Sequence, residues 1–349
     1  MAALSNFFRP RDRNPAPTVY RPVRRNEIEA ALRLILGGAK PATDEQVLDF
    51  LSFSIGRGID VNGIWVADCA GRIDWALLPV PSAGRTMLLF SPARAPRGVP
   101  RSAVGELVER VLAASAAPAG VVLAQVLLEA HESELISRYV SARFERLADL
   151  AYLQARVRGT EPLPALPDGW RIDTYDIAGH AQFAQTIAET YEGSLDCPTL
   201  NGRREIDDIV AGHKAAGDFD PRLWFLLRRD DGRPAGGMLL SRSHGNAQAE
   251  LVYVGLVPDA RGRGAGDLLI RWALAVTGLE GRRYLSLAVD AANTPALRLY
   301  FRHGFARVGV RTALIRDLRL APPRASEPRG SPAAGVVSPS LVAEPPARG

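Results

Sequence analysis

Apolar positions in the second half of the chain alternate and cluster in a way that predicts a series of strands. Apolar runs with β-branched or aromatic residues predict strands at GWRIDTYD (169–176), LWFLLRRD (223–230), GMLLSRS (237–243) and AELVYVGLVP (249–258). Turn residues at DDGRPAG and SHGN separate the last three. Between the first strand and the second, apolar residues at helical spacing predict amphipathic helices over 180–191 and 202–216.

The next elements follow in a simple order. A helix is predicted from Gly264 to about Gly278, followed by the apolar strand YLSLAVD (284–290). A short helix, TPALRLYFRHG, begins behind Asn293 and ends at Gly304, and a last strand runs through RTALIRDL (311–318). The pattern indicates an α/β unit whose central strands lead into a helix through a glycine-rich turn.

This unit has a counterpart 161 residues earlier in the chain. Tyr300 and Phe305 match Tyr139 and Phe144, the helix GDLLIRWAL (266–274) matches GELVERVLA (105–113), and Gly232-Arg233 matches Gly71-Arg72. Several matches at one offset indicate a duplication. We therefore expect two α/β domains of the same fold, each a mixed, mostly antiparallel central sheet flanked by helices. Their expected bounds are 18–160 and 169–320, with a linker at 161–168.

Composition and charge restrict the function classes. Both ends are predicted to be disordered, at 1–17 and at the Pro/Ala-rich 321–349. The first 25 residues contain six Arg and one Asp, which accounts for the net charge of +5. The rest is formally neutral, so we expect no nucleic-acid partner. No apolar run is long enough for a membrane span or a signal peptide, so we expect a cytoplasmic protein without a membrane partner.

Cysteine and histidine positions argue against structural bridges and metal sites. Cys69 and Cys197 lie far apart in the sequence, so we expect neither a disulfide framework nor a four-ligand zinc site. The five histidines show no metal-ligand spacing, so we predict no metal. The sequence predicts no particular oligomeric state.

The strongest chemical signal is the loop Arg261-Gly262-Arg263-Gly264-Ala265-Gly266, between a strand and a helix. Glycines let backbone N–H groups converge, and the positive end of the helix dipole favours a phosphate. A P-loop requires Lys-Ser/Thr after the last glycine, whereas Asp267-Leu268 follows here. A Rossmann unit requires helical crossovers before the loop, whereas short turns join these strands. A glycine-rich turn with no ligand is the plain alternative.

This pattern resembles the GCN5-related N-acetyltransferase (GNAT) family. The family's strand ending V-x-P and loop Q/R-x-x-G-x-G/A are similar to the Val257-Pro258 region with Arg261, Gly264 and Gly266. The family's downstream N-x-x-A-x-x-L-Y-x-x-x-G-F is met by Asn293, Ala296, Leu299, Tyr300, Gly304 and Phe305. The resemblance covers about 169–320, and the duplication extends it to a tandem form similar to that of mycothiol synthase.

The resemblance implies acetyl-CoA as the acyl donor. Peptide N–H groups of Gly262, Gly264, Ala265 and Gly266 would bind its pyrophosphate, with charge added by Arg261 and Arg263. The backbone near Leu256 would pair with the pantetheine arm, and Asn293 would donate to it. The Asp267 carboxylate is expected to turn away, because it would repel the pyrophosphate.

Two residues are candidates for proton transfer. Tyr300 stays protonated at neutral pH and can donate a proton to the departing thiolate; a ring packed in the core is its plain alternative. Glu250 lies 11 residues before Arg261, a spacing similar to that of the catalytic glutamate in histone-acetylating members. An exposed strand residue is the alternative for Glu250.

The acceptor is expected to bind at the segment TYEGSLDCPTLNG (190–202), which joins the first two helices of the second copy. Tyr191, Glu192 and Asp196 combine acidic groups with an aromatic ring, which suits a cationic amine. The same residues suit a solvated loop. Cys197 is interpreted as a packing residue, and the acceptor is left open between a small molecule and a protein amine.

The first copy has lost the corresponding chemistry. Arg261, Gly264 and Asn293 are matched there by Pro100, Ala103 and Glu132, and no Asp or Glu occurs between Trp75 and Gly105. We therefore predict an N-acetyltransferase with catalysis in the second copy, by direct attack of a primary amine on the acetyl (or short acyl) group. The first copy would complete the active site of the second copy or form one of its walls. The alternative is a module that binds acyl-CoA or another ligand without turnover.

Overall fold

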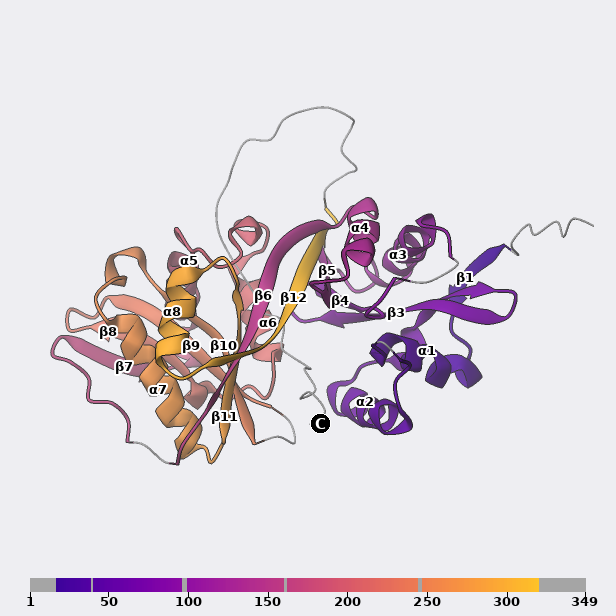
Figure 1. The fold of residues 1–349 in the computed structure, drawn as a ribbon. Coiled ribbons are helices and arrows are strands. Elements are labelled where there is room, and N and C mark those ends of the chain that lie inside the picture. Colours follow the sequence, from indigo (N-terminus) through magenta and orange to yellow (C-terminus); the bar gives the residue numbers. More distant parts are fainter. Residues whose placement is uncertain (1–16, 39, 96–98, 160–161, 244–246, 320–349) are drawn as a thin grey trace, which may run out of the picture.

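The computed structural model describes residues 17–38, 40–95, 99–159, 162–243 and 247–319. The expected N-terminal arm (1–17) and C-terminal tail (321–349) lie outside the described residues, except for residue 17. Within the described part, strands and helices alternate in two series of the same order (Figure 1).

All the strands belong to one twelve-stranded sheet, in the order β1-β2-β3-β4-β5-β12-β6-β11-β10-β9-β8-β7. Only β4/β5 and β10/β11 are parallel neighbours within the described sheet. The predicted mixed, mostly antiparallel architecture is therefore confirmed. The strands are β1 (Thr18–Pro22), β2 (Trp65–Cys69), β3 (Arg72–Ser82), β4 (Thr86–Phe90), β5 (Leu123–Glu129), β6 (Glu145–Arg156), β7 (Trp170–Thr174), β8 (Trp224–Arg229), β9 (Pro234–Arg242), β10 (Gln248–Leu256), β11 (Tyr284–Asp290) and β12 (Ala306–Asp317).

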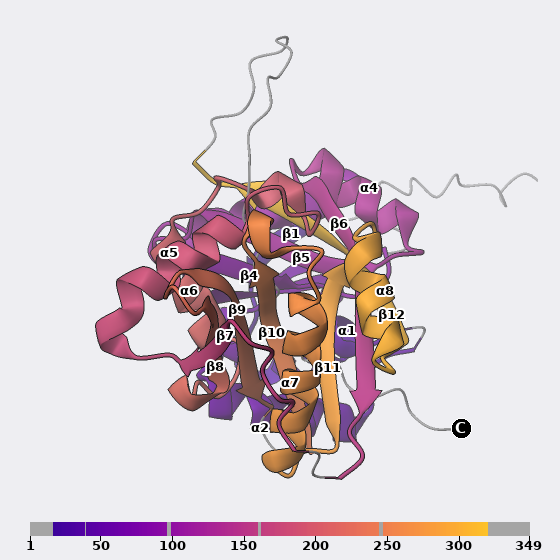
Figure 2. The ribbon, with the colours of Figure 1, turned by 90° about the vertical axis from the view of Figure 1, so that its left-hand side faces the viewer.

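The helices cover both faces of the sheet. They are α1 (Ile28–Leu36), α2 (Asp44–Arg57), α3 (Ser102–Ser115), α4 (Ser133–Ser141), α5 (His180–Thr190), α6 (Ile206–Ala215), α7 (Ala265–Leu279) and α8 (Thr294–Arg302). In the second half, α7 and α8 pack on one face and α5 and α6 on the other, each pair over its own buried cluster. Figure 2 shows the two pairs apart from each other.

The element bounds reproduce the repeat. Strands β5 and β11, helices α4 and α8, and strands β6 and β12 each begin and end 161 residues apart. Three consecutive elements of the first copy thus have counterparts of equal length at the same offset in the second copy. The duplication predicted from a few matched residues therefore extends to the structure.

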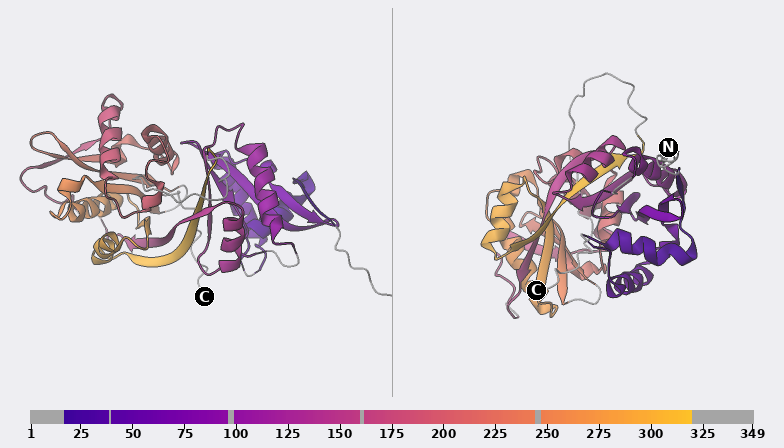
Figure 3. Two further views of the ribbon diagram at one scale, coloured as in Figure 1. Left: turned by 90° about the horizontal axis from the view of Figure 1, so that it is seen from above. Right: turned by 45° about the vertical axis from the view of Figure 1, so that its right-hand side comes forward.

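The last strand of each copy lies in the sheet of the other. Strand β12 pairs with β5 of the first half, and β6 pairs with β11 of the second half. The two strands also pair with each other, and the pair Leu150–Arg311 joins equivalent positions, so it marks a local two-fold relation. Figures 1 and 3 show these long strands running together between the halves. The second half thus contains a strand from residues 145–156.

Most predicted elements of the second half occur at their predicted places, and the largest difference is at the last strand. β12 begins at Ala306, five residues before the predicted start at Arg311. Residues 306–308 are exposed, although β12 pairs with β6 there. Ala306, Val308 and Val310 alternate with Arg307, Gly309 and Arg311, so the alternation already extends to Ala306 and the predicted strand is too short at its start.

Candidate active site

The two central strands of the second half separate near the glycine-rich loop. Strands β10 and β11 pair only over Gln248–Glu250 and Tyr284–Ser286. A register shift between Leu251 and Tyr253 follows in β10, which stays paired with β9 as far as Leu256. Strand β11 continues beside β6 instead. Beyond Glu250, the β11-facing edge of β10 has no partner strand in the described sheet, so its peptide groups are available to an extended ligand.

The loop after β10 has the backbone conformation that requires glycine. Gly262 and Gly264 have φ values of +71° and +82°. A Cβ at either position would meet no atom within 4 Å, so conformation and not space selects glycine here. Gly264 is the N-cap of α7, and the first N–H groups of that helix have no partner within the helix. The loop and the helix start therefore form a site for an anion.

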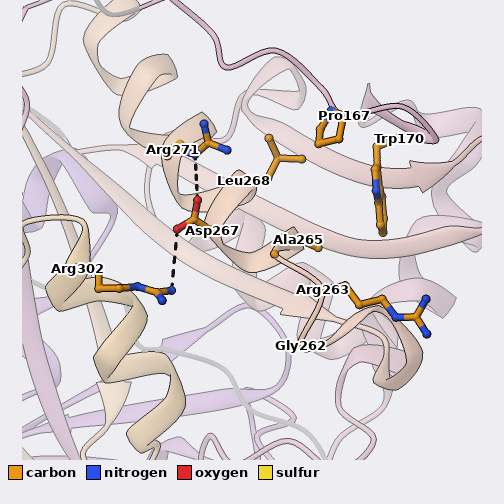
Figure 4. Close-up of a pocket in the computed structure, with 10 residues that line it drawn as sticks. Pro167, Trp170, Gly262, Arg263, Ala265, Asp267, Leu268, Arg271 and Arg302 are labelled. Atoms are coloured by element: carbon orange, nitrogen blue, oxygen red, sulfur yellow. Dashed lines mark hydrogen bonds and ion pairs between the residues drawn. The ribbon is translucent and has the colours of Figure 1, made fainter.

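A cavity of about 590 Å³ opens beside this loop (Figure 4). Its walls come from the loop, from α7, from Arg302 of α8, and from the segment that enters β7. Asp267 lies in this wall, and its carboxylate contacts His303 Nε2 at 2.8 Å and Arg271 Nε at 3.1 Å. Its charge is therefore partly balanced by these neighbours. The lining residues are Pro167, Trp170, Gly262, Arg263, Gly264, Ala265, Asp267, Leu268, Arg271 and Arg302.

The Arg261 side chain is bound to backbone carbonyls instead of facing this cavity. Its Nε donates to Leu256 O at 3.0 Å, and Nη2 donates to Thr190 O at 3.0 Å and Glu192 O at 2.6 Å. A third nitrogen, Nη1, donates to Gly193 O at 3.3 Å. Arg261 therefore ties the glycine-rich loop to the end of α5. Arg263 is exposed and lines the cavity, where its positive charge is available to an anion.

Glu250 lies on the face of the sheet that α5 and α6 cover. Its neighbours Ala249 and Leu251 belong to the cluster under α7 and α8, so the Glu250 side chain points to the opposite face. The residue is only 4% exposed. The plain alternative of an exposed strand residue is therefore wrong, and a buried carboxylate lies where β10 and β11 begin to separate.

Tyr300 and Asn293 belong to α8, on the other side of the separating strands. Tyr300 is buried, and burial, with smaller contributions from Asp196 and Tyr253, raises its pKa above the ordinary value. Its phenol therefore stays protonated at neutral pH. Asn293 is the N-cap of α8, and its Oδ1 accepts from the N–H of Ala296 at 3.3 Å. This side chain thus has a structural partner in the absence of a ligand.

The segment 190–202 is folded against the end of β11. The N–H of Asp290 donates to Asp196 Oδ1 at 2.7 Å, and the N–H of Cys197 donates to Asp290 Oδ2 at 3.2 Å. Desolvation raises the pKa of Asp196 to about 6. Tyr191 is buried, with its ring 5.4 Å from that of Tyr253, whereas the Glu192 side chain is exposed. The structure therefore places Asp196 near Tyr300 and Tyr191 beside Tyr253, and it leaves Glu192 at the surface.

Sequence reasoning missed Tyr253 and did not assign Asp290 to this site. Tyr253 OH lies 2.5 Å from Thr190 Oγ1, so it joins β10 to α5. The bulge directs Tyr253 toward α5, and no local pattern in the sequence marks that bulge. Asp290 could have been noticed as a carboxylate at the end of an apolar strand, but its partner Asp196 is 94 residues away.

The first half packs against the same segment. Arg204 follows it, and its Nη2 donates to Gly84 O at 3.1 Å and to Asp208 O at 2.8 Å. Gly84 lies in the turn between β3 and β4, with φ at +75°. Arg203 also forms an ion pair with Glu145 of β6. A turn and a strand of the first copy therefore hold the chain between 202 and 208.

In the first copy, the described residues directly before α3 lack the anion-binding conformation. Helix α3 begins after Arg101, an N-cap with φ at −57°. Ala103, which replaces Gly264, is buried, with 1% exposure. No residue with positive φ occurs between 99 and the end of α3 in the described chain. Among the described residues no group of His, Cys, Asp and Glu could hold a metal ion, and neither Cys69 nor Cys197 forms a disulfide bond.

Comparisons with known proteins agree on one family. A family model described as "Acetyltransferase (GNAT) family" matches residues 187–305. The mycothiol acetyltransferase of Clavibacter michiganensis subsp. michiganensis is 31% identical over 231 residues, 64% of this chain and 69% of the relative. The mycothiol acetyltransferase of Nocardia farcinica is 32% identical over 231 residues, 64% of this chain and 71% of the relative.

Solved structures show the same fold. A GCN5-related N-acetyltransferase from Sphaerobacter thermophilus aligns with a TM-score of 0.61 at 18% identity, over 86% of this chain and 96% of that one. A tandem GNAT protein from the clavulanic acid biosynthesis pathway aligns with a TM-score of 0.50 at 16% identity, over 86% and 98%. None of the helices in the described ranges has the length and apolarity needed to cross a bilayer.

Proposed function

This chain belongs to the acetyltransferase (GNAT) family and is an N-acetyltransferase, and from that premise we propose that its active site is the separation between β10 and β11. The observation that carries the proposal is the joint position of three features of the second half. A left-handed glycine loop opens α7, an unpaired edge of β10 leads away from it, and a buried carboxylate, Glu250, lies where the strands meet.

Acetyl-CoA would lie along these features in one direction. Its pyrophosphate would accept from the N–H groups of residues 262–266, and the pantetheine arm would follow the β10 edge near Leu256. The adenosine phosphate portion would occupy the cavity beside Arg263 and Trp170. Asn293 would donate to the pantetheine through its amide N–H group, while its Oδ1 continues to cap α8. Arg261 would act by positioning the loop.

The transfer needs one proton acceptor and one proton donor. The amine nitrogen attacks the thioester carbonyl carbon, the C–N bond forms, and the C–S bond breaks. Glu250 takes a proton from the nitrogen, directly or through a water molecule. Tyr300 donates its phenolic proton to the departing CoA thiolate, and it can do so because burial keeps it protonated. No covalent acyl-enzyme is needed, since burial also raises the pKa of the Cys197 thiol well above its ordinary value.

We take the acceptor to be a small-molecule primary amine. Relatives named as mycothiol acetyltransferases favour a small molecule over a protein. Burial of Glu250 under α5 and α6 also favours an acceptor that enters as a compact molecule. Asp196 would attract its ammonium group and Tyr191 would form part of the wall.

The direct test is acceptor-dependent release of free thiol from acetyl-CoA. The full chain is mixed with acetyl-CoA and glucosamine, spermidine or tyramine in turn, and the thiol is measured with a chromogenic reagent. We expect at least one amine to raise thiol release well above hydrolysis, with an equal amount of acetylated amine. Tight binding of acetyl-CoA without amine-dependent release would instead support the non-catalytic alternative.

The acidic limb of the pH profile is expected to report Asp196. Because its pKa is raised to about 6, the carboxylate becomes fully ionised only above that pH. The acceptor kcat/KM should therefore rise as the pH increases through about 6, in addition to the titration of the amine itself. Asp196→Asn should remove this limb and lower the acceptor kcat/KM by about tenfold near neutral pH.

The control for this profile is Glu189→Gln, an exposed carboxylate on the neighbouring helix α5. It should retain the wild-type pH profile. If the Asp196→Asn chain keeps the limb near pH 6, another group titrates there and Asp196 has no part in acceptor binding.

Gly84→Ala tests whether the first half supports the acceptor segment. A Cβ at Gly84 would lie 2.0 Å from Asp208 O and 2.4 Å from Arg204 Nη2, so α6 must shift. We expect the acceptor KM to rise severalfold, with the Kd for acetyl-CoA unchanged. Gly71→Ala is the matched control, since Gly71 has a similar φ of +84° in another turn of the first half and its Cβ would meet nothing within 4 Å. Equal kinetic effects of both variants would argue against this support.

A further inference from the structure

The strand exchange places two side chains of the first copy on the acceptor face of the second half. In β6, Ala151, Leu153 and Ala155 belong to the cluster under α7 and α8. Because side chains alternate along a strand, Tyr152 and Gln154 point to the opposite face, the one that carries Glu250. Figure 1 shows β6 next to β11 in this half.

Strand register aligns Gln154 with the candidate base. Glu250 is opposite Ser241 of β9 on one side and Ser286 of β11 on the other. Ser286 is in turn opposite Gln154 of β6. One row across four strands therefore carries Ser241, Glu250, Ser286 and Gln154. Gln248, two residues before Glu250 in β10, links two members of this row: Gln154 Nε2 donates to Gln248 Oε1 at 3.2 Å, and Gln248 Nε2 donates to Ser286 Oγ at 2.7 Å.

Tyr152 lies one step further along β6, opposite Ala288 of β11. This is the direction in which β10 and β11 separate. Tyr152 is 5% exposed, and it belongs to the same buried cluster as Cys197 and Leu200 of the acceptor segment. The surroundings of its ring are thus the exchanged strand, the end of β11 and the segment that would contact the acceptor.

The Tyr152 hydroxyl is buried and has no hydrogen-bond partner among the described residues. A buried polar atom without a partner costs roughly 1–3 kcal/mol, so such atoms are rare unless a ligand or a water molecule satisfies them. Burial is the main cause that raises the pKa of Tyr152; the nearby charge of Arg311 lowers this pKa, and the charge of Glu250 raises it by less. The phenol therefore remains neutral, and its oxygen can accept a hydrogen bond from an ammonium or amine N–H.

We propose that Tyr152, supplied by the exchanged strand of the first copy, binds the acceptor amine beside Glu250 and so determines its orientation. The inference rests on the proposed function, because it takes the α5/α6 face as the acceptor side. The equivalent position of β12 is Ala313, so the other half has no such hydroxyl. The first copy thus contributes a binding residue to the active site in addition to its support of the fold.

Tyr152→Phe tests this role because it removes only the hydroxyl. We expect the acceptor KM to rise about tenfold, the fold-change of one lost hydrogen bond of about 1.4 kcal/mol, with the Kd for acetyl-CoA unchanged. The assay uses whichever of glucosamine, spermidine and tyramine gives the fastest thiol release. The Tm is expected to stay the same or rise, since the hydroxyl has no protein partner to lose.

The matched control is Tyr139→Phe, which removes a hydroxyl from an equally buried tyrosine in the core of the first half. It should leave the acceptor KM and kcat within about twofold of wild type. A folded Tyr152→Phe chain with the wild-type acceptor KM would overturn the proposal, whatever its Tm. That result would mean that the hydroxyl binds only a buried water molecule, which affects stability and not acceptor binding. A wild-type chain that releases no thiol with any of the amines would contradict the proposed function itself.

Discussion

Glu250→Gln is expected to lower kcat for acetyl transfer by roughly 10²–10⁴-fold and to leave the Kd for acetyl-CoA within about twofold of wild type. The amide keeps the size and most of the hydrogen-bonding capacity of the carboxylate, but it cannot take the proton of the attacking nitrogen. Glu250 is buried on the face opposite α7 and α8, where it would not contact the pyrophosphate. Single-turnover rates and calorimetric titration with acetyl-CoA separate the two effects.

The control for Glu250→Gln is Glu280→Gln, which changes a carboxylate of the same half that is paired with Arg242 at 2.6 Å. This variant should keep wild-type kcat. Wild-type turnover of Glu250→Gln at neutral and alkaline pH would exclude Glu250 as the base. Asp196, a carboxylate near Tyr300, would then be the next candidate.

Gly264→Val is expected to weaken acetyl-CoA binding by at least about 100-fold. Valine disfavours the φ of +82° found at this N-cap, and a left-handed conformation costs a non-glycine residue roughly 1–2 kcal/mol. Relaxation to a right-handed φ would turn the loop N–H groups away from the position of the pyrophosphate. The added side chain would also hinder the close approach of the pyrophosphate to the loop backbone. Fluorescence or calorimetric titration measures the loss.

A matched variant separates strain from binding. Gly281 lies just beyond the other end of α7, with φ at +69°, and a Cβ there would also meet nothing within 4 Å. Gly281→Val should destabilise the chain to a similar extent and leave acetyl-CoA binding unchanged. Equal loss of binding in both variants would mean that the glycine loop has no specific role in holding the acyl donor.

Local patterns were sufficient for the elements that form the site. The strand over 284–290 is predicted to the residue, because its apolar run is bounded by turn residues on both sides. The start of α8 behind Asn293 is also confirmed, because an Asn cap and a following Pro define a helix start. The glycine loop at 262–266 could be located for a similar reason, since backbone positions with positive φ are usually occupied by glycine.

Long-range pairing could not be predicted in this way. Strands β6 and β12 have the same length and equivalent places in the two copies. No local sequence feature therefore indicates whether each of them pairs with strands of its own copy or of the other copy. The role of Arg261 depends on the same kind of information, because its partners at 190–193 are about seventy residues away. An arginine beside glycines fits a phosphate site in the sequence, whereas the folded chain offers it four carbonyls.

The two halves differ at the position that would carry the base. In the first half, Gln125 corresponds to Ser286 at the repeat offset, and its partner in β4 is Leu88. The equivalent partner in the second half is Glu250. The first half therefore has an apolar side chain where the second has a carboxylate. This agrees with the right-handed backbone of Arg101, the N-cap of α3. Both differences support the proposal of a single active site per chain.

Calorimetric titration of the full chain with acetyl-CoA distinguishes one binding site from two. We expect one acetyl-CoA bound per chain, at the second copy, and we expect Gly264→Val to remove the heat of binding. Two equivalent sites per chain, or a site that remains unchanged in the Gly264→Val chain, would contradict this prediction.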